Sequence, residues 1–140
     1  MPETMATEAQ TSSSSPGHGP SASATVVVIE DEPQIRRFLR AALVSQGYRF
    51  YEAATGREGL AEAATRQPDV IILDLGLPRL AGEDVGRELA SHPSLRSIPI
   101  IVVTGQDTGS LDLTSFACVL HKPVTAEALV RAITDCLDEI

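Results

Sequence analysis

Residues 68–82 read PDVIILDLGLPRLAG and residues 25–31 read TVVVIED. In both stretches a short, uninterrupted aliphatic run ends on acidic side chains, which are Asp74 in the first and Glu30 with Asp31 in the second. Such runs are typical of strands that are buried on both faces of a parallel sheet. Because these sheets bind ligands at the carboxyl ends of their strands, we predict that the three carboxylates share one crevice.

Three neighbouring carboxylates repel one another and resist ionising together, so the cluster favours a site that a cation shares. Oxygen ligands suit a hard divalent ion. Magnesium fits best, with manganese as the alternative, because magnesium takes few protein carboxylates and completes its shell with water and phosphate oxygens. The acidic cluster therefore predicts a phosphoryl site.

The rest of the chain alternates between strand-like and helix-like patterns. Further strands are expected over 48–54, at a sheet edge, and over 98–103 and 117–121. Helices are expected from Pro33 to Gly47 (with Ile35, Phe38, Leu39, Ala42 and Leu43 on one buried face), from the capping box of Thr55 and Glu58 to Arg66, over 82–91, and at the C-terminal end (with Leu129, Ile133, Leu137 and Ile140 on one side).

This alternation predicts an α/β fold, a three-layer sandwich with a five-stranded parallel sheet and four or five helices. A nucleotide-binding Rossmann half and a flavodoxin-type order are the two alternatives. The first is disfavoured, because EDEP rather than a G-x-G-x-x-G loop follows the first strand.

Composition divides the 140 residues into two parts. Residues 1–23 are rich in Ser, Thr, Pro and Gly and have almost no bulky apolar groups, so burial cannot offset the entropy cost of ordering them. We predict a disordered tail there and one domain over 24–140. The formal net charge of −8 argues against a nucleic-acid surface, because phosphate backbones need clustered Lys and Arg.

Several function classes are disfavoured by what the chain lacks. No stretch approaches the length of a membrane span, and no secretory signal opens the sequence. The two cysteines, Cys118 and Cys136, fit no metal-binding spacing and lie in apolar surroundings, which favours buried free thiols. These features predict a protein of the reducing cytoplasm that does not contact membranes.

Five landmarks occur in order along the chain, and together they resemble the response-regulator receiver domains of two-component signalling. That family has an acidic pair after strand one, a phospho-accepting Asp with a D-x-x-x-P-x-x-x-G loop after strand three, a Ser or Thr after strand four and a Lys-Pro after strand five. The matching residues are Glu30, Asp31, Asp74, Pro78, Gly82, Thr104, Lys122 and Pro123. The resemblance covers about residues 25–140 and implies a flavodoxin-like strand order of 2-1-3-4-5. The first half is also similar to the receivers of potassium-transport (Kdp) regulators, which belong to the winged-helix group.

The resemblance implies a role for each site residue. Asp74 would accept the phosphoryl group, and the metal ligands would be Asp31, Asp74, Glu30 (directly or through water) and the backbone carbonyl of Gly76. Lys122, supported by Pro123, would pair with the phosphoryl oxygens, and the hydroxyl of Thr104 would move in to bond them. By this resemblance the chain is a phosphorylation-dependent switch and not an enzyme acting on a metabolite. Its partners would be a sensor histidine kinase or phosphotransfer protein and a downstream protein effector, and a weak homodimer is left open.

Three departures from the family pattern change these expectations. Val119 stands three positions before Lys122, where the family usually has an aromatic residue, so the usual coupling of hydroxyl movement to a rotating ring is not expected. Gly105, where Ala is common, would leave extra room beside the phosphoryl group. The 18 positions from Thr104 to Lys122 are about one helical turn fewer than usual, so we expect the fourth helix to be short or irregular.

Other functions stay open at this point. We favour a stand-alone receiver because the last turn, TDCLDEI, lacks a basic linker, but the receiver part of a longer DNA-binding transcriptional regulator is the alternative. A pseudo-receiver that binds partners without phosphorylation is disfavoured by the complete set of acidic, Thr and Lys residues. A phosphatase with an aspartyl nucleophile needs a second acidic residue two positions on, where this chain has Gly76.

Overall fold

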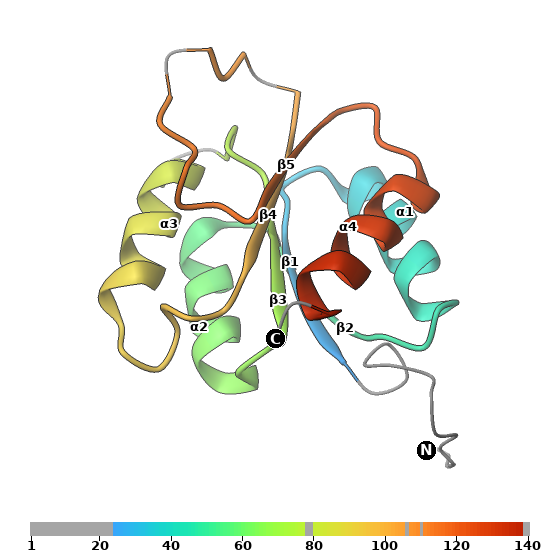
Figure 1. The fold of residues 1–140 in the computed structure, drawn as a ribbon, viewed down its shortest axis with the longest axis horizontal. Coiled ribbons are helices and arrows are strands. Elements are labelled where there is room, and N and C mark those ends of the chain that lie inside the picture. Colours follow the sequence, from blue (N-terminus) through green and yellow to red (C-terminus); the bar gives the residue numbers. More distant parts are fainter. Residues whose placement is uncertain (1–23, 78–79, 106, 110, 139–140) are drawn as a thin grey trace.

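The computed structural model describes residues 24–77, 80–105, 107–109 and 111–138. Five parallel strands form one open sheet in the order β2-β1-β3-β4-β5 (Figure 1). The strands are β1 (Thr25–Ile29), β2 (Arg49–Ala53), β3 (Val70–Leu73), β4 (Ile100–Thr104) and β5 (Cys118–His121). The helices of the described ranges are α1 (Pro33–Val44), α2 (Gly56–Arg66), α3 (Gly82–Ser91) and α4 (Ala126–Asp138). The predicted α/β fold and strand order are confirmed.

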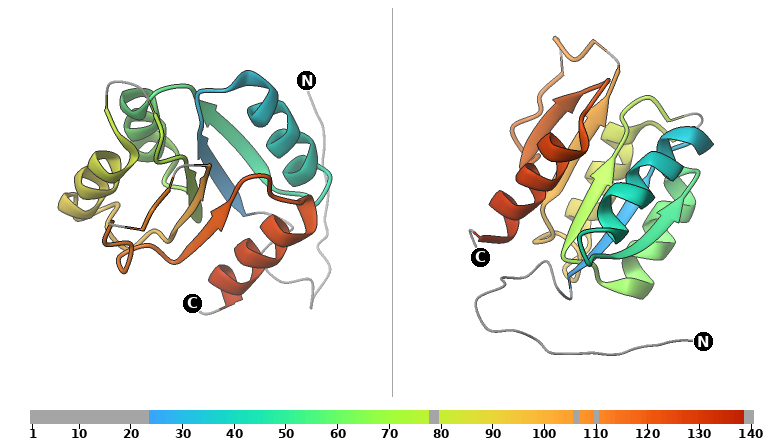
Figure 2. Two further views of the ribbon diagram at one scale, coloured as in Figure 1. Left: turned by 90° about the horizontal axis from the view of Figure 1, so that it is seen from above. Right: turned by 90° about the vertical axis from the view of Figure 1, so that its right-hand side faces the viewer.

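Helices cover both faces of the sheet and create two cores. Successive strand side chains point to opposite faces, so Val26 and Val28 pack with α1 and α4, while Val27 and Ile29 pack with α2 and α3. Figure 2 shows the two helical layers on either side of the sheet. Burial on both sides explains why the central strands are apolar at every position instead of alternating.

Strand register brings the chemically important residues to one edge of the sheet. Ile29 of β1 is paired with Leu73 of β3, so Glu30 and Asp74 follow two paired residues directly. In the next two strands of the sheet, Thr104 is the last residue of β4, and its carbonyl oxygen accepts a hydrogen bond from the backbone N–H of Lys122, just after β5, at 2.9 Å. Main-chain pairing alone therefore places these four residues at the same end of the strands.

Local sequence signals lie close to the helix ends, although α1 ends at Val44 and not at the expected Gly47. The hydroxyl of Thr55 accepts a hydrogen bond from the backbone N–H of Glu58 at 3.1 Å and caps α2. After α1, Gly47 adopts a φ of 92°, a left-handed conformation that favours glycine. The boundaries of α3 are those expected from the sequence.

The connection from β4 to β5 contains no helix within residues 105, 107–109 and 111–117, which the structure describes. Instead, Leu111, Leu113 and Phe116 pack against the core on the α2 and α3 side, and the Phe116 ring lies beside Gly86 of α3. A Cβ atom added to Gly86 would lie 3.0 Å from that ring, so the glycine makes room for it. In place of the short or irregular fourth helix that was expected, the described part of this connection is irregular throughout, and its apolar side chains cover the core there.

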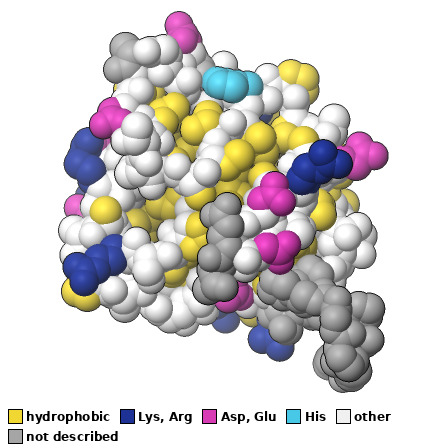
Figure 3. All heavy atoms as spheres, in the orientation of Figure 1, with side chains coloured by type: hydrophobic (Ala, Val, Ile, Leu, Met, Phe, Trp, Pro, Cys, Tyr) yellow, Lys and Arg dark blue, Asp and Glu magenta, His cyan; other side chains and the backbone are white. Residues whose placement is uncertain are grey.

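Figure 3 shows hydrophobic side chains across the centre of the face that carries β5 and this connection. Half-buried Cys118 and Leu120 of β5 belong to the core on the α1 and α4 side. These side chains of β5 are only half-buried because β5 lies at the edge of the sheet.

Two predictions about burial were wrong. Phe38, expected on the buried face of α1, is 41 % exposed, because Leu39 and Leu43 already fill the space between the helix and the sheet. Cys118 and Cys136 are reduced thiols but are half-buried rather than buried, since one lies on the edge strand and the other near the end of α4. The predictions for residues 1–23, Pro78 and Ile140 lie outside the described residues.

Candidate metal and phosphoryl site

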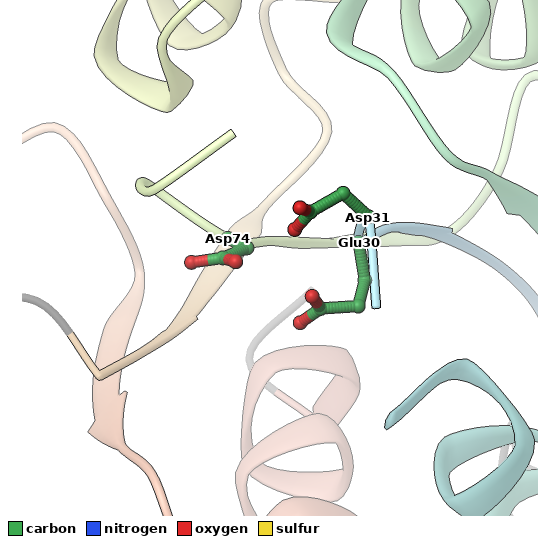
Figure 4. A group of neighbouring side chains, drawn as sticks. All are labelled: Glu30, Asp31 and Asp74. Atoms are coloured by element: carbon green, nitrogen blue, oxygen red, sulfur yellow. The ribbon is translucent and has the colours of Figure 1, made fainter. Parts of the chain in front are cut away.

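Three carboxylates meet where β1 and β3 end. Glu30, Asp31 and Asp74 each present an oxygen within 4.8 Å of the other two, and Figure 4 shows the three groups around one space. Glu30 is 2 % exposed and Asp74 is 6 % exposed, while Asp31 is half-buried at the mouth of the site. The structure therefore brings together the acidic residues that the sequence pattern singled out.

One cation of the chain lies among these carboxylates. The Lys122 ammonium is 2.8 Å from an oxygen of Glu30 and 3.3 Å from Asp74 Oδ2. It is also 3.6 Å from Glu32, a half-exposed residue that the sequence reasoning did not include in the site. The only available signal for Glu32 was its place as the third acidic residue of the run EDE.

The electrostatic cost of the cluster is visible at Glu30. Burial raises the pKa of its carboxyl group, and the negative charge of Asp74 adds to that effect, against the hydrogen bonds from Lys122 and from the backbone N–H of Glu32. For Lys122, burial disfavours the charged ammonium, but Glu30 and Asp74 together outweigh it and raise the pKa. Lysine is therefore held as a cation, and the carboxylates remain incompletely neutralised.

The donor set fits a divalent metal ion. Glu30, Asp31 and Asp74 carry three formal negative charges and Lys122 returns one positive charge, which leaves an excess of two. A divalent cation cancels that excess, and an all-oxygen site suits magnesium or manganese. Close-set carboxylates, one of them with a raised pKa, are the arrangement in which such an ion relieves repulsion.

The loop after β3 is built around Asp74. The backbone N–H of Asp74 donates to the carbonyl of Ile29 at 3.1 Å, and Asp74 Oδ1 accepts from the backbone N–H of Gly76 at 3.0 Å. A Cβ atom on Gly82 would lie 2.4 Å from the Cα of Leu75 and 2.6 Å from the carbonyl oxygen of Asp74. Glycine at position 82 thus lets α3 begin directly against this loop.

The structure also places the remaining residues predicted for the site. Thr104 is fully buried at the end of β4. Gly105 is exposed beside Lys122, and a Cβ atom added there would lie 3.9 Å from the lysine side chain, in ordinary contact. Pro123 follows Lys122 through a cis peptide bond. Val119 is half-buried in β5 and packs with the core that contains Phe116.

Comparison with known proteins identifies the class. A model of the response regulator receiver domain matches residues 26–134, most of the chain. The chain belongs to this family, whose members act in two-component signalling. The expectation that the sequence motifs raised is therefore confirmed.

Two similar proteins differ in how much of their length the chain covers. The KDP operon transcriptional regulatory protein KdpE of Escherichia coli is 48 % identical over 85 residues, which are 61 % of this chain and 36 % of that protein. The chain thus spans about a third of the length of this relative. Protein PilH of Pseudomonas aeruginosa is 30 % identical over 124 residues, which cover 81 % of this chain and 98 % of PilH.

Solved structures share the fold across most of the chain. The chemotaxis response regulator CheY4 of Vibrio cholerae superposes with a TM-score of 0.76 and 27 % identity, over 81 % of this chain and 98 % of CheY4. The receiver domain of the sensor histidine kinase PA1611 of Pseudomonas aeruginosa gives a TM-score of 0.77 and 28 % identity, over 84 % and 99 % of the two chains. That structure contains a magnesium ion coordinated in its active site cleft. In this chain, no helix of the described residues is long and apolar enough to cross a membrane.

Proposed function

We propose that the chain is a phosphorylation-dependent signalling switch in which Asp74 accepts a phosphoryl group from a sensor histidine kinase or phosphotransfer protein. The observation that carries the proposal is the joint geometry of three carboxylates and one ammonium around a single nearly buried aspartate. The magnesium-bound receiver domain of PA1611 supports the same assignment.

Each side chain has a defined task in the transfer. An oxygen of Asp74 attacks phosphorus and forms the new P–O bond, while the bond from phosphorus to the donor breaks and the donor keeps its electron pair. Magnesium, held by Asp31 and Asp74, by Glu30 directly or through water, and by the carbonyl of Gly76, would neutralise the phosphoryl oxygens. Lys122 supplies the second positive charge, and its ion pair with Asp74 passes to a phosphoryl oxygen after transfer.

The switch would begin at Thr104. Its hydroxyl would move to bond the phosphoryl group and take the end of β4 with it, which changes the population of partner-binding surfaces. Because Val119 replaces the usual aromatic residue in β5, that movement would not pass through a rotating ring at this position. The output is then the binding of a protein effector, and the chain catalyses only its own phosphorylation and dephosphorylation. We propose a cytoplasmic location, where such kinases present their phosphohistidine.

The test is intact-mass spectrometry after incubation with acetyl phosphate and magnesium. Wild type should gain one phosphate and Asp74→Asn should gain none. Asp69→Asn is the matched control, because Asp69 lies just before β3, at the opposite end of the strand from Asp74. Wild type that stays unlabelled while fully folded would refute the proposal and would favour a pseudo-receiver that binds partners without phosphorylation.

The similar proteins support two settings for this receiver. Likeness to KdpE, a transcriptional regulatory protein, supports a receiver that controls an attached DNA-binding domain. Likeness to PilH, which the chain spans over 98 % of its length, supports a receiver that acts alone. Reading the gene beyond codon 140 distinguishes the two settings.

A further inference from the structure

Arg36 of α1 contacts the loop that carries the acidic pair. Its guanidinium donates from Nη1 to the backbone carbonyl of Glu30 at 2.8 Å and from Nε to Glu52 of β2 at 2.9 Å. Its side chain is only 19 % exposed. One side chain thus ties together the first helix, the end of β1 and the neighbouring edge strand.

The same loop is held at several other points on Glu30. Its backbone N–H donates to the carbonyl of Ala53 at 3.0 Å, and its carboxylate accepts from the backbone N–H of Glu32 at 3.1 Å and pairs with Lys122. With the bond from Arg36, both main-chain polar groups of Glu30 are fixed. The N–H holds the peptide that precedes Glu30, and the carbonyl bonded by Arg36 orients the peptide between residues 30 and 31.

Asp31 depends on that orientation. Among the described residues its carboxylate has neither a hydrogen bond nor an ion pair, unlike the carboxylates of Glu30 and Asp74. The position of the Asp31 carboxylate, within 4.8 Å of those of Glu30 and Asp74, is consequently set by the backbone of Asp31. That backbone is joined directly to the Glu30 carbonyl, which Arg36 holds. A group that fixes the backbone of a metal ligand acts on affinity in the way outer-shell partners do.

We infer that Arg36 is a positioning residue for the metal site, which fixes the Glu30–Asp31 peptide so that the Asp31 carboxylate faces Asp74. The inference rests on the proposed function, because it concerns the ion which that function uses. Glu52 contributes to this positioning, because its carboxylate accepts a hydrogen bond from Nε of Arg36 and so orients the guanidinium.

The alternative role of Arg36 is purely electrostatic, and it predicts an effect of opposite sign. A positive charge near the cluster repels a magnesium ion, so removal of the charge alone would tighten magnesium binding. Removal of a positioning contact would weaken it, typically by 10-fold or more for an outer-shell partner, on the order of the losses seen at other metal sites. The sign of the change therefore decides between the two roles.

The experiment titrates magnesium alone into the full chain and follows the dissociation constant by NMR, with thermal unfolding in EDTA as a separate measure of folding. The variants are Arg36→Gln, the charge-conserving Arg36→Lys, and Arg40→Gln. Arg40 is the matched control, because it lies one turn further along α1 and approaches the same Glu52 at 3.7 Å, but it is 62 % exposed and makes no contact with Glu30.

We expect Arg36→Gln to weaken magnesium binding about 10-fold and Arg40→Gln to leave it unchanged or slightly tighter. Arg36→Lys keeps the charge, but a lysine ammonium cannot reproduce the planar guanidinium that donates to both Glu30 and Glu52. The magnesium affinity of this variant should therefore fall between those of wild type and Arg36→Gln. If Arg36→Gln does not fold, Arg36→Lys decides the question by the same comparison with Arg40→Gln.

Two negative results have different meanings. Equal or tighter magnesium binding by a folded Arg36→Gln or Arg36→Lys variant would overturn the role of Arg36 and leave the proposed function intact. Absence of magnesium binding by wild type would instead count against the proposed function itself.

Discussion

Neutralising Asp31 should stabilise the metal-free protein although it removes a site residue. In Asp31→Asn the side chain keeps its shape and loses its charge, and no hydrogen bond or ion pair of the described residues is broken. Asp74→Asn would be a less direct test, because Asp74 also accepts from Gly76 and pairs with Lys122. The variant thus isolates the repulsion between the carboxylates.

The size of the effect follows from the geometry. Two unit charges 4.8 Å apart repel by about 3.5 kcal/mol at an effective dielectric constant near 20. Solvent at half-buried Asp31 and the positive charge of Lys122 reduce this value. We therefore expect a gain of about 1 kcal/mol in the free energy of unfolding, which corresponds to a rise of about 4 °C in Tm.

Thermal unfolding in EDTA and in saturating magnesium provides the assay. Wild type should gain stability in magnesium by about 2.7 kcal/mol when the ion is present at a hundredfold excess over Kd, and Asp31→Asn should gain much less. The order of the two Tm values should therefore reverse between the two conditions. Asp135→Asn, which removes the same charge from the exposed surface of α4, should show no such reversal. An Asp31→Asn variant that is less stable than wild type in EDTA would refute the reasoning.

Three further predictions concern packing and pH. Gly82→Ala should cost about 1–3 kcal/mol by overpacking against backbone atoms and slow the labelling of Asp74, whereas Gly105→Ala, with space for a methyl group, should change stability by less than about 0.5 kcal/mol in urea titrations. In EDTA, wild type should gain stability relative to Glu30→Gln as the pH falls from about 7 to about 5, because the raised pKa of Glu30 makes the folded state bind its proton more readily than the unfolded chain does. Phe116→Ala should cost about 1–3 kcal/mol, less than a fully buried ring, as measured by urea unfolding.

Much of the fold could be predicted from the sequence because its signals are local. The apolar runs that end at Glu30 and Asp74 define central strands, and the capping box of Thr55 defines a helix start. The strand order could not be predicted from such local signals. Alternation of strands and helices permits more than one order, and only the family resemblance selected this one. Burial of Phe38 was mispredicted because helical periodicity gives the direction of a face but not its width.

The site was predictable as far as its residues follow strand ends. Glu30, Asp74 and Lys122 stand directly after paired strands, and Asp31 follows Glu30, so the topology brings them together. Glu32 and Arg36 were not predicted, because their contacts depend on how the first helix is oriented over the sheet. No pattern in the sequence measures that angle. The use of Phe116 to fill the place of a helix was hidden for the same reason.

The most direct test of the account compares phosphate incorporation with and without a divalent ion. Intact wild-type protein is incubated with acetyl phosphate in magnesium or in EDTA, and its mass is then measured. The account predicts one added phosphate in magnesium, little or none in EDTA, and none on Asp74→Asn in either condition. Equal incorporation in EDTA, or a phosphate on Asp74→Asn, would contradict the claim that the acidic cluster and its cation make Asp74 reactive.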